Sequence, residues 1–379
     1  MYHGLTATID LNAVADNVRA LQRAAGSAEV AGVIKSDAYG LGMKEIAATL
    51  YACGCRSFYT AHLWEAVEAR RAFPDIRVAP LNGIAAGREA ETLSHGVTPV
   101  IYDLASLERF RNAAQKTGKK IPVILFIDTG INRLGFEAQD WRRLGSEPAL
   151  LEGLHPAMVM SHLACADEPK HELNKKQLAA FVEAVKLFPN TKKSFANSPS
   201  IFLGPEYHFD EVRPGRALSG MRLAGVKQNP LTPALTLQAP ILQVRSIDRD
   251  GAVGYGATQH VTKGMRLATL AAGYSDGVLR GFGNSDENRA HFFSLGGHKV
   301  PVVGRISMEL TVIDVSAVPE SLAHAGALVE IAGPARDIDA QAESAGTIGY
   351  ELMTLIGQRV ERRYIPLKID STEEQRKAS

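Results

Sequence analysis

Several side chains able to do nucleophilic or acid–base chemistry follow short apolar runs of the length that buried strands have. Lys35 follows the run at 31–34, and a lysine at the edge of an apolar core loses hydration of its ammonium form. Its pKa then falls, and the amine becomes a nucleophile able to form a Schiff base, although a lysine can also simply extend into water there. The other side chains in such positions are Asp128, Arg133, His162, Asn197, Ser198 and Arg213. Their common placement predicts one polar rim.

A second group of residues is suited to binding a phosphate. Ser198 offers a hydroxyl, and Gly215, within the segment 213–216, lets the backbone approach a ligand closely. Gly40 and Gly42 precede a predicted helix, where backbone amides bind anions, but glycine is also an ordinary turn residue. This group favours a phosphorylated ligand or cofactor and leaves its identity open.

The elements that must position these residues alternate between strands and helices. Strands are expected at 30–35, 57–61, 77–81, 98–102, 122–128, 158–163, 193–197 and 211–213. Amphipathic helices are expected at 11–25, 42–52, 63–73, 88–95, 104–116 and 170–187. Eight strands in this alternation predict an α/β (β/α)8 barrel with its site at the C-terminal strand ends, and an open doubly wound sheet is the alternative.

The pattern changes after about residue 235 to β-branched stretches separated by glycine. Strands are expected there at 239–247, 265–272, 299–303, 310–315 and 327–331. We therefore predict two domains, a ligand-binding barrel over 1–235 and a mostly-β domain over 236–379.

Composition excludes several classes of partner. The chain has 42 Lys and Arg against 41 Asp and Glu, a net charge of +1 that gives no attraction to nucleic acid or anionic lipid. Its longest apolar run is about seven residues, too short to span a bilayer. The N-terminus has no signal-peptide pattern, and the three cysteines are too few for a disulfide scaffold, so we expect a cytoplasmic protein. The scattered histidines predict no metal site.

The ordered motifs resemble those of the alanine racemase family, pyridoxal-phosphate enzymes of fold type III. The matching segments are VIKSDAYG at 33–40, IDTGINRLG at 127–135, SHL at 161–163, ANS at 196–198, VRPG at 212–215, GYGA at 254–257, GYSDG at 273–277, VGRISM at 303–308 and IGYE at 348–351. The resemblance covers nearly the whole chain. It implies pyridoxal 5'-phosphate as cofactor and an N-terminal barrel followed by a β domain.

By this resemblance each motif has a role in binding the cofactor or the substrate. Lys35 would hold the cofactor covalently, Arg213 would face its pyridine nitrogen, and His162 would pack beside the ring. Arg133 would reach the phenolic oxygen and the substrate carboxylate. The phosphate would be held by Tyr39, Ser198, Gly215, the backbone of Arg216 and Tyr350, with Asn197 beside them.

The resemblance also implies a racemase that interconverts L- and D-alanine and supplies D-alanine for the cell wall. Lys35 and Tyr255 would be bases on opposite faces of Cα, and Tyr255 and Met308 would come from the partner in a homodimer. Neither group is a base at its reference pKa of about 10. Burial lowers the pKa of a lysine but raises that of a tyrosine, so Tyr255 needs positive charge nearby, for which His162 and Arg213 are the candidates.

Four positions depart from the family pattern. Phe126 replaces a carbamylated lysine that orients Arg133 in many members, and Glu309 replaces an aspartate near the carboxylate-binding region. Ser219 and Leu41 replace a common tyrosine and a frequent histidine. The open alternatives are a racemase of serine or a larger amino acid, a basic amino-acid decarboxylase, a non-catalytic cofactor carrier, and a barrel that only binds a phosphorylated ligand.

Overall fold

The computed structural model describes residues 4–223, 226 and 229–368, which form two compact units. The barrel unit contains residues 14–38 and 42–232, and the β unit contains residues up to 13, residues 39–41 and residues from 233 onward. The first residues join the β unit because strand β1 (Thr6–Asp10) pairs antiparallel with β11 (Leu235–Ser246) and parallel with β19 (Glu361–Ile365). The predicted limits, 1–235 and 236–379, assign residues 1–13 and 39–41 to the barrel.

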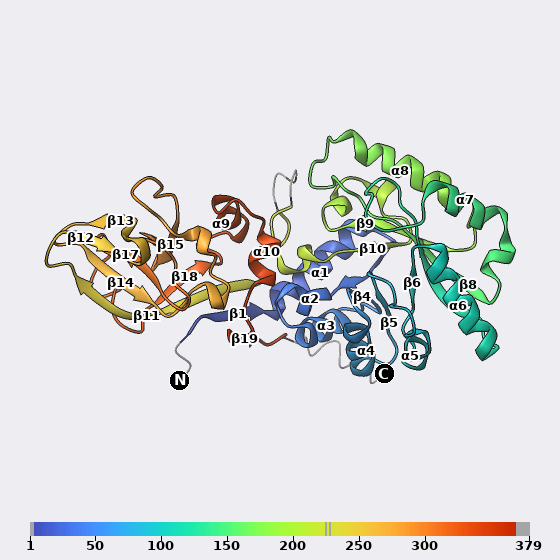
Figure 1. The fold of residues 1–379 in the computed structure, drawn as a ribbon, viewed down its shortest axis with the longest axis horizontal. Coiled ribbons are helices and arrows are strands. Elements are labelled where there is room, and N and C mark those ends of the chain that lie inside the picture. Colours follow the sequence, from blue (N-terminus) through green and yellow to red (C-terminus); the bar gives the residue numbers. More distant parts are fainter. Residues whose placement is uncertain (1–3, 224–225, 227–228, 369–379) are drawn as a thin grey trace. The chain divides into compact units, whose positions relative to one another are not determined.

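The barrel unit contains parallel strands with helices beside them (Figure 1), and backbone hydrogen bonds close these strands into a ring. One sheet has the order β2-β10-β9-β8-β7-β6 and the other β3-β4-β5. The chain joins them directly from β2 to β3, and the amide of Thr98 donates to the carbonyl of Val78 at 2.9 Å, which joins β5 to the segment entering β6. The strands are β2 (Glu29–Val30), β3 (Gly32–Val33), β4 (Ser57–Thr60), β5 (Arg77–Pro80), β6 (Val100–Ile101), β7 (Ile121–Phe126), β8 (Leu154–Met160), β9 (Lys192–Asn197) and β10 (Glu211–Arg213). This ring confirms the predicted (β/α)8 barrel.

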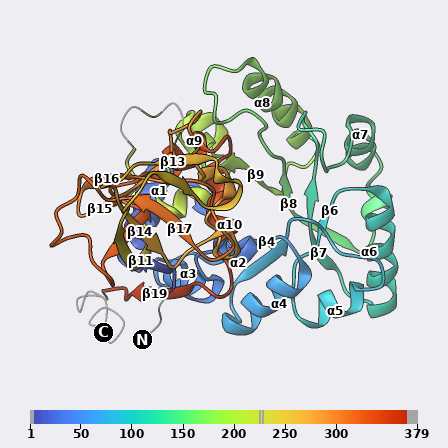
Figure 2. The same cartoon turned by 60° about the vertical axis from the view of Figure 1, so that its left-hand side comes forward.

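Helices cover the outside of the barrel, and Figure 2 shows α4, α5 and α6 along the outer side of its strands. Each buries one apolar face: in α1, Val14, Val18 and Leu21 are fully buried at helical spacing. The helices are α1 (Leu11–Ala25), α3 (Met43–Ala52), α4 (Leu63–Ala72), α5 (Glu89–Ser94), α6 (Leu104–Thr117), α7 (Ala138–Ser146) and α8 (Glu172–Val185), whereas α2 (Lys35–Tyr39) is a short turn of left-handed residues. Helix α7 was not predicted, because only Trp141 and Leu144 in it are buried.

The β unit is built around the long strand β11. This strand pairs with β1, β14 and β18, so one apolar run of the sequence organises most of the sheet. The other strands are β12 (Gly251–Val253), β13 (Gln259–Val261), β14 (Arg266–Leu270), β15 (Phe292–Leu295), β16 (His298–Pro301), β17 (Thr311–Asp314) and β18 (Leu328–Ala332), with the helices α9 (Ile338–Ser344) and α10 (Gly349–Thr354). The predicted strands at 239–247, 265–272, 299–303, 310–315 and 327–331 correspond to β11, β14, β16, β17 and β18.

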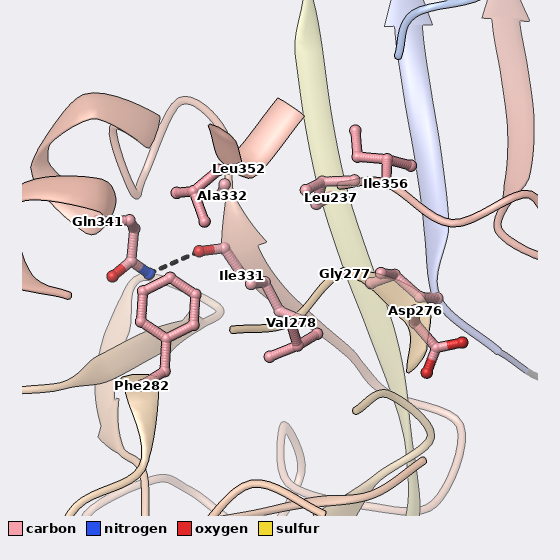
Figure 3. A pocket seen from close by; sticks show the side chains of 11 residues that line it. Leu237, Asp276, Gly277, Val278, Phe282, Ile331, Ala332, Gln341, Leu352 and Ile356 are labelled. Carbon is pink, nitrogen blue, oxygen red and sulfur yellow. Dashed lines mark hydrogen bonds between the residues drawn. The ribbon is translucent and has the colours of Figure 1, made fainter. Parts of the chain in front are cut away.

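A small apolar cavity lies inside the β unit (Figure 3). Leu237, Val278 and Phe282 line it, and the side-chain amide of Gln341 donates to the carbonyl of Ile331 at 2.6 Å beside it. Its volume of about 10 Å³ accommodates no more than a water molecule. None of the predicted site residues lines it, so we interpret this cavity as part of the core. Within the described residues, no helix is long and apolar enough to cross a membrane.

Candidate functional site

Lys35 lies at the C-terminal end of β3 and begins an unusual turn. Ser36, Asp37, Ala38 and Tyr39 have φ values of 53°, 53°, 51° and 59°, so four successive non-glycine residues are left-handed. The Asp37 carboxylate accepts a hydrogen bond from the Met43 amide at 2.7 Å, and the Ser36 amide donates to Glu65 at 2.7 Å. The turn that follows Lys35 is therefore held by side-chain acceptors.

The charge around Lys35 favours its neutral amine. Burial lowers the pKa of Lys35, the positive charge of Arg133 lowers it further, and the carboxylate of Glu65 acts in the opposite direction. Arg133 itself is exposed and makes no hydrogen bond within the described residues, while Phe126 is buried at the end of β7. Within the described residues, no other side chain hydrogen-bonds to Arg133 and orients it in place of the carbamylated lysine that many family members have at position 126.

His162 is uncharged at neutral pH. Burial and the charges of Arg213, Arg133 and Lys35 lower its pKa to about 3. Its Nε2 lies 3.4 Å from Nδ2 of Asn197. His162 is therefore wrong as a candidate source of positive charge for Tyr255, because desolvation and the neighbouring guanidinium groups of Arg213 and Arg133 disfavour its protonated form. Arg213 remains as a source of positive charge in this group.

Arg213 is a buried guanidinium at the end of β10. It is 5% exposed, and it donates to Oγ of Ser194 at 2.6 Å and to the carbonyl of Ser161. Burial lowers its pKa, and the negative charge of Glu211 partly compensates. An arginine stays protonated in such surroundings, so it presents fixed positive charge and hydrogen-bond donors.

Backbone amides converge where β9 and β10 end. Oγ of Ser198 accepts hydrogen bonds from the amides of Gly215 at 2.9 Å and Ala217 at 3.2 Å. The side chain of Arg216 is directed elsewhere, with an ion pair of 3.2 Å to Asp167, so only its backbone belongs to this group. A hydroxyl and neighbouring amides of this kind form a donor set suited to a phosphate.

The remaining predicted residues belong to the β unit. Tyr39 and Tyr350 lie together, with ring centroids 6.0 Å apart. Tyr255 and Met308 are exposed over 73% and 55% of their surfaces. Glu309 receives a hydrogen bond of 3.1 Å from Arg359. Tyr255 and Met308 thus contribute little to the core of their own unit.

Sequence reasoning missed several buried polar residues that support the site. Gln177 of α8 accepts from the Ala164 amide at 2.9 Å and donates to the carbonyl of His162 at 2.9 Å. Glu65 of α4 and Glu211 of β10 are likewise buried and hydrogen-bonded. The only sequence signal for these residues was a polar side chain on an otherwise apolar helix face or strand. Such a residue belongs to no recognisable motif.

Each half of the chain matches a known protein family. The family described as "Alanine racemase, N-terminal domain" matches residues 9–223, and "Alanine racemase, C-terminal domain" matches residues 234–364. The chain belongs to the alanine racemase family. Curated alanine racemases extend the match: one from Rhodospirillum rubrum is 44% identical over 94% of this chain and 95% of its own. A catabolic and a biosynthetic alanine racemase of Agrobacterium fabrum are 40% and 38% identical, so identity does not separate the two roles.

Solved structures of alanine racemases have the same fold. The alanine racemase of Bartonella henselae, with covalently bound pyridoxal phosphate, has a TM-score of 0.91 and 35% identity, covering 96% of this chain and all of that one. The biosynthetic alanine racemase of Pseudomonas aeruginosa has a TM-score of 0.87 and 31% identity over the same shares. The barrel of the present member offers matching chemistry, namely a lysine with a lowered pKa and a buried serine hydroxyl that two backbone amides hold in place. The residues present fit such a cofactor.

Proposed function

We propose that this chain is a pyridoxal-phosphate-dependent isomerase that interconverts L-alanine and D-alanine. The observation that carries the proposal is the juxtaposition, in a member of this family, of Lys35 with a lowered pKa and of the cation Arg133 at one end of the barrel. The cofactor, when bound, withdraws electrons from the substrate Cα and so acidifies its proton. The substrate is a small amino acid.

The residues identified from the family motifs would bind the cofactor. Lys35 would attach it covalently, the amides of Gly215 and Arg216 with Ser198 would hold its phosphate, and Tyr39 and Tyr350 would add hydroxyl groups. His162 would pack against the ring as a neutral imidazole, held by the neighbouring Asn197. Arg213 would place a permanent cation at the pyridine nitrogen, which keeps that nitrogen unprotonated and restrains side reactions such as transamination.

Two bases on opposite faces would move the proton. The neutral amine of Lys35 would take it from one face, and the phenol oxygen of Tyr255 would serve the other, so that removal on one side and return on the other inverts Cα. Arg133 would bind the substrate carboxylate, and because no residue of the described part hydrogen-bonds to it, its side chain can turn to that carboxylate. Met308 would lie against the small side chain.

Tyr255 and Met308 would act in the active site of a second copy of the chain. Their exposure supports a homodimer with shared sites, since a phenol and a thioether so exposed have little to contact within their own unit. We place the enzyme in the cytoplasm, as a supplier of D-alanine for peptidoglycan. No nucleic acid or membrane partner is proposed.

Proton exchange tests this function. The purified chain is incubated with pyridoxal phosphate and L-alanine in heavy water, and loss of the Cα–H signal is followed by NMR together with chiral analysis. Deuterium at Cα with formation of D-alanine is expected. If alanine remains unchanged although the cofactor spectrum depends on Lys35, the alanine assignment fails, and serine and larger amino acids are the substrates to test next.

A further inference from the structure

The backbone after Lys35 is strained. Ser36, Asp37, Ala38 and Tyr39 all adopt positive φ without being glycine, a conformation that the Cβ atom of an L-residue disfavours. Left-handed residues ordinarily occur singly. A run of four persists only where neighbouring groups hold it, and the residue directly before the run is Lys35.

Glu65 is a neighbouring group that stabilises this left-handed turn. Its side chain is buried, with 2% exposed, and one oxygen accepts from the Ser36 amide at 2.7 Å. The other oxygen accepts from the amides of Ala61 at 2.7 Å and His62 at 2.9 Å. Ser36 follows β3, and the latter two follow the neighbouring parallel strand β4. One carboxylate therefore connects two loops at the same end of the barrel.

Glu65 also bears on the charge of Lys35. The charged or titratable groups that act on Lys35 are the carboxylate of Glu65 and the guanidinium of Arg133, and the imidazole of His162 faces it in neutral form. Burial and Arg133 lower the pKa of Lys35, and Glu65 opposes them. Of these groups, only Glu65 adds negative charge.

We propose that Glu65 is a positioning residue, which clamps the left-handed turn after Lys35 to the end of β4 and sets the electrostatic surroundings of the Lys35 amine. This inference rests on the proposed role of Lys35, and it adds to the site a residue that lies outside the family motifs. Glu65 donates no proton and touches no reacting atom. Its effect passes through the Ser36 backbone and through charge.

Two measurements on the full chain without cofactor or substrate test the proposal. The pH dependence of Lys35 acylation, followed by mass spectrometry of its peptide, reports the pKa of the amine. The rate of hydrogen exchange at the Ser36 amide reports how well its hydrogen bond to Glu65 protects it. In Glu65→Gln we expect a lower pKa of Lys35, because the negative charge is gone, and exchange at Ser36 about tenfold or more faster, because a hydrogen bond to a charged acceptor is weakened. Glu68→Gln, on the exposed face of the same helix, should change neither.

Two further variants separate the clamp from the charge. Glu65→Asp keeps the negative charge but is one methylene shorter, so Ser36 should lose protection while the pKa of Lys35 stays above its value in Glu65→Gln. Ser36→Gly relieves the strain, since glycine adopts positive φ freely, and should reduce the loss of thermal stability that Glu65→Gln causes. The last comparison applies even if Glu65→Gln alone folds poorly.

An unchanged Lys35 pKa in Glu65→Gln, unchanged Ser36 exchange, or an equal stability loss with and without Ser36→Gly would each overturn the proposal. Because no readout uses alanine, failure here is distinguishable from failure of the racemase assignment. The deuterium exchange described above decides that assignment independently.

Discussion

At the scale of single residues, the surroundings of Lys35 favour its neutral amine, the form that the proposed chemistry requires. Burial removes water from the ammonium form, and the charge of Arg133 disfavours it further. A free lysine is almost wholly protonated at neutral pH, since its pKa is about 10.4. The same two effects that favour nucleophilic attack also favour uptake of a proton from substrate by the neutral amine.

Lys35→Ala should remove covalent attachment of pyridoxal phosphate. Borohydride reduction followed by mass spectrometry should find the added cofactor mass on Lys35 in the unaltered chain and on no residue of the variant. Racemisation should fall by about 10²–10⁴-fold or more, because a base is lost together with the attachment point. Lys44→Ala, an exposed lysine of α3, is the matched control and should retain both. Attachment that survives in Lys35→Ala contradicts the assignment.

His162 should make the chain less stable in acid. Its pKa is about 3 in the folded chain and about 6.5 when unfolded, so between these values the unfolded state binds more protons. Stability from this group is full above pH 6.5 and is lost as the pH falls toward 3. Between pH 7.5 and pH 5, His162→Asn should therefore lose about 2 kcal/mol less stability than the unaltered chain, measured by urea unfolding without cofactor. His155→Asn, at an exposed position, should leave the pH dependence unchanged.

The residues that bear on chemistry were partly predictable. Lys35, Ser198 and Arg213 follow apolar strands, so their positions at one end of a barrel follow from the pattern. Glu65 and Gln177 escaped prediction because a buried acceptor of backbone amides has no sequence signature, and only the fold shows which amides it reaches. The charge of His162 was misjudged because desolvation depends on burial that composition does not reveal.

At the scale of elements, helix α8 supports the loop that carries His162. Gln177 is fully buried and binds the Ala164 amide and the His162 carbonyl. Gln177→Leu should lower the free energy of unfolding by about 1–3 kcal/mol, because both backbone groups lose their partner. Thermal unfolding measures this loss. Lys175→Leu, at an exposed position of the same helix, is the control. If the two variants are equally stable, the hydrogen bonds of Gln177 do not stabilise the chain.

Element boundaries were predicted correctly where the residues that determine them lie close together in the sequence. Helix α1 spans the predicted residues 11–25, and β10 spans the predicted 211–213. The strand expected at 158–163 is instead Leu154–Met160, because the chain leaves the sheet before His162. Strand β1 was missed because its partners, β11 and β19, lie more than 200 residues away in the sequence.

At the scale of the whole molecule, the two proposed bases belong to different units. Lys35 is part of the barrel unit, and Tyr255 is part of the β unit, where its ring is largely exposed. If Tyr255 acts in the site of a partner chain, two different inactive chains should complement each other. The proposed homodimers of Lys35→Ala and of Tyr255→Phe would each lack one base in both sites.

Co-expression of the two variants in equal amounts decides this question. Random pairing makes about half of the dimers mixed, and in a mixed dimer one site lacks both bases while the other has both, so about a quarter of the unaltered activity should return. If Tyr255 served its own chain, every site of the mixed dimer would lack one base and no activity would return. Differently tagged chains allow the mixed dimer to be purified, with about half of the unaltered activity per dimer expected in alanine racemisation. Co-expression of Lys35→Ala with Lys35→Ala,Tyr255→Phe is the control that should stay inactive, because neither chain supplies Lys35.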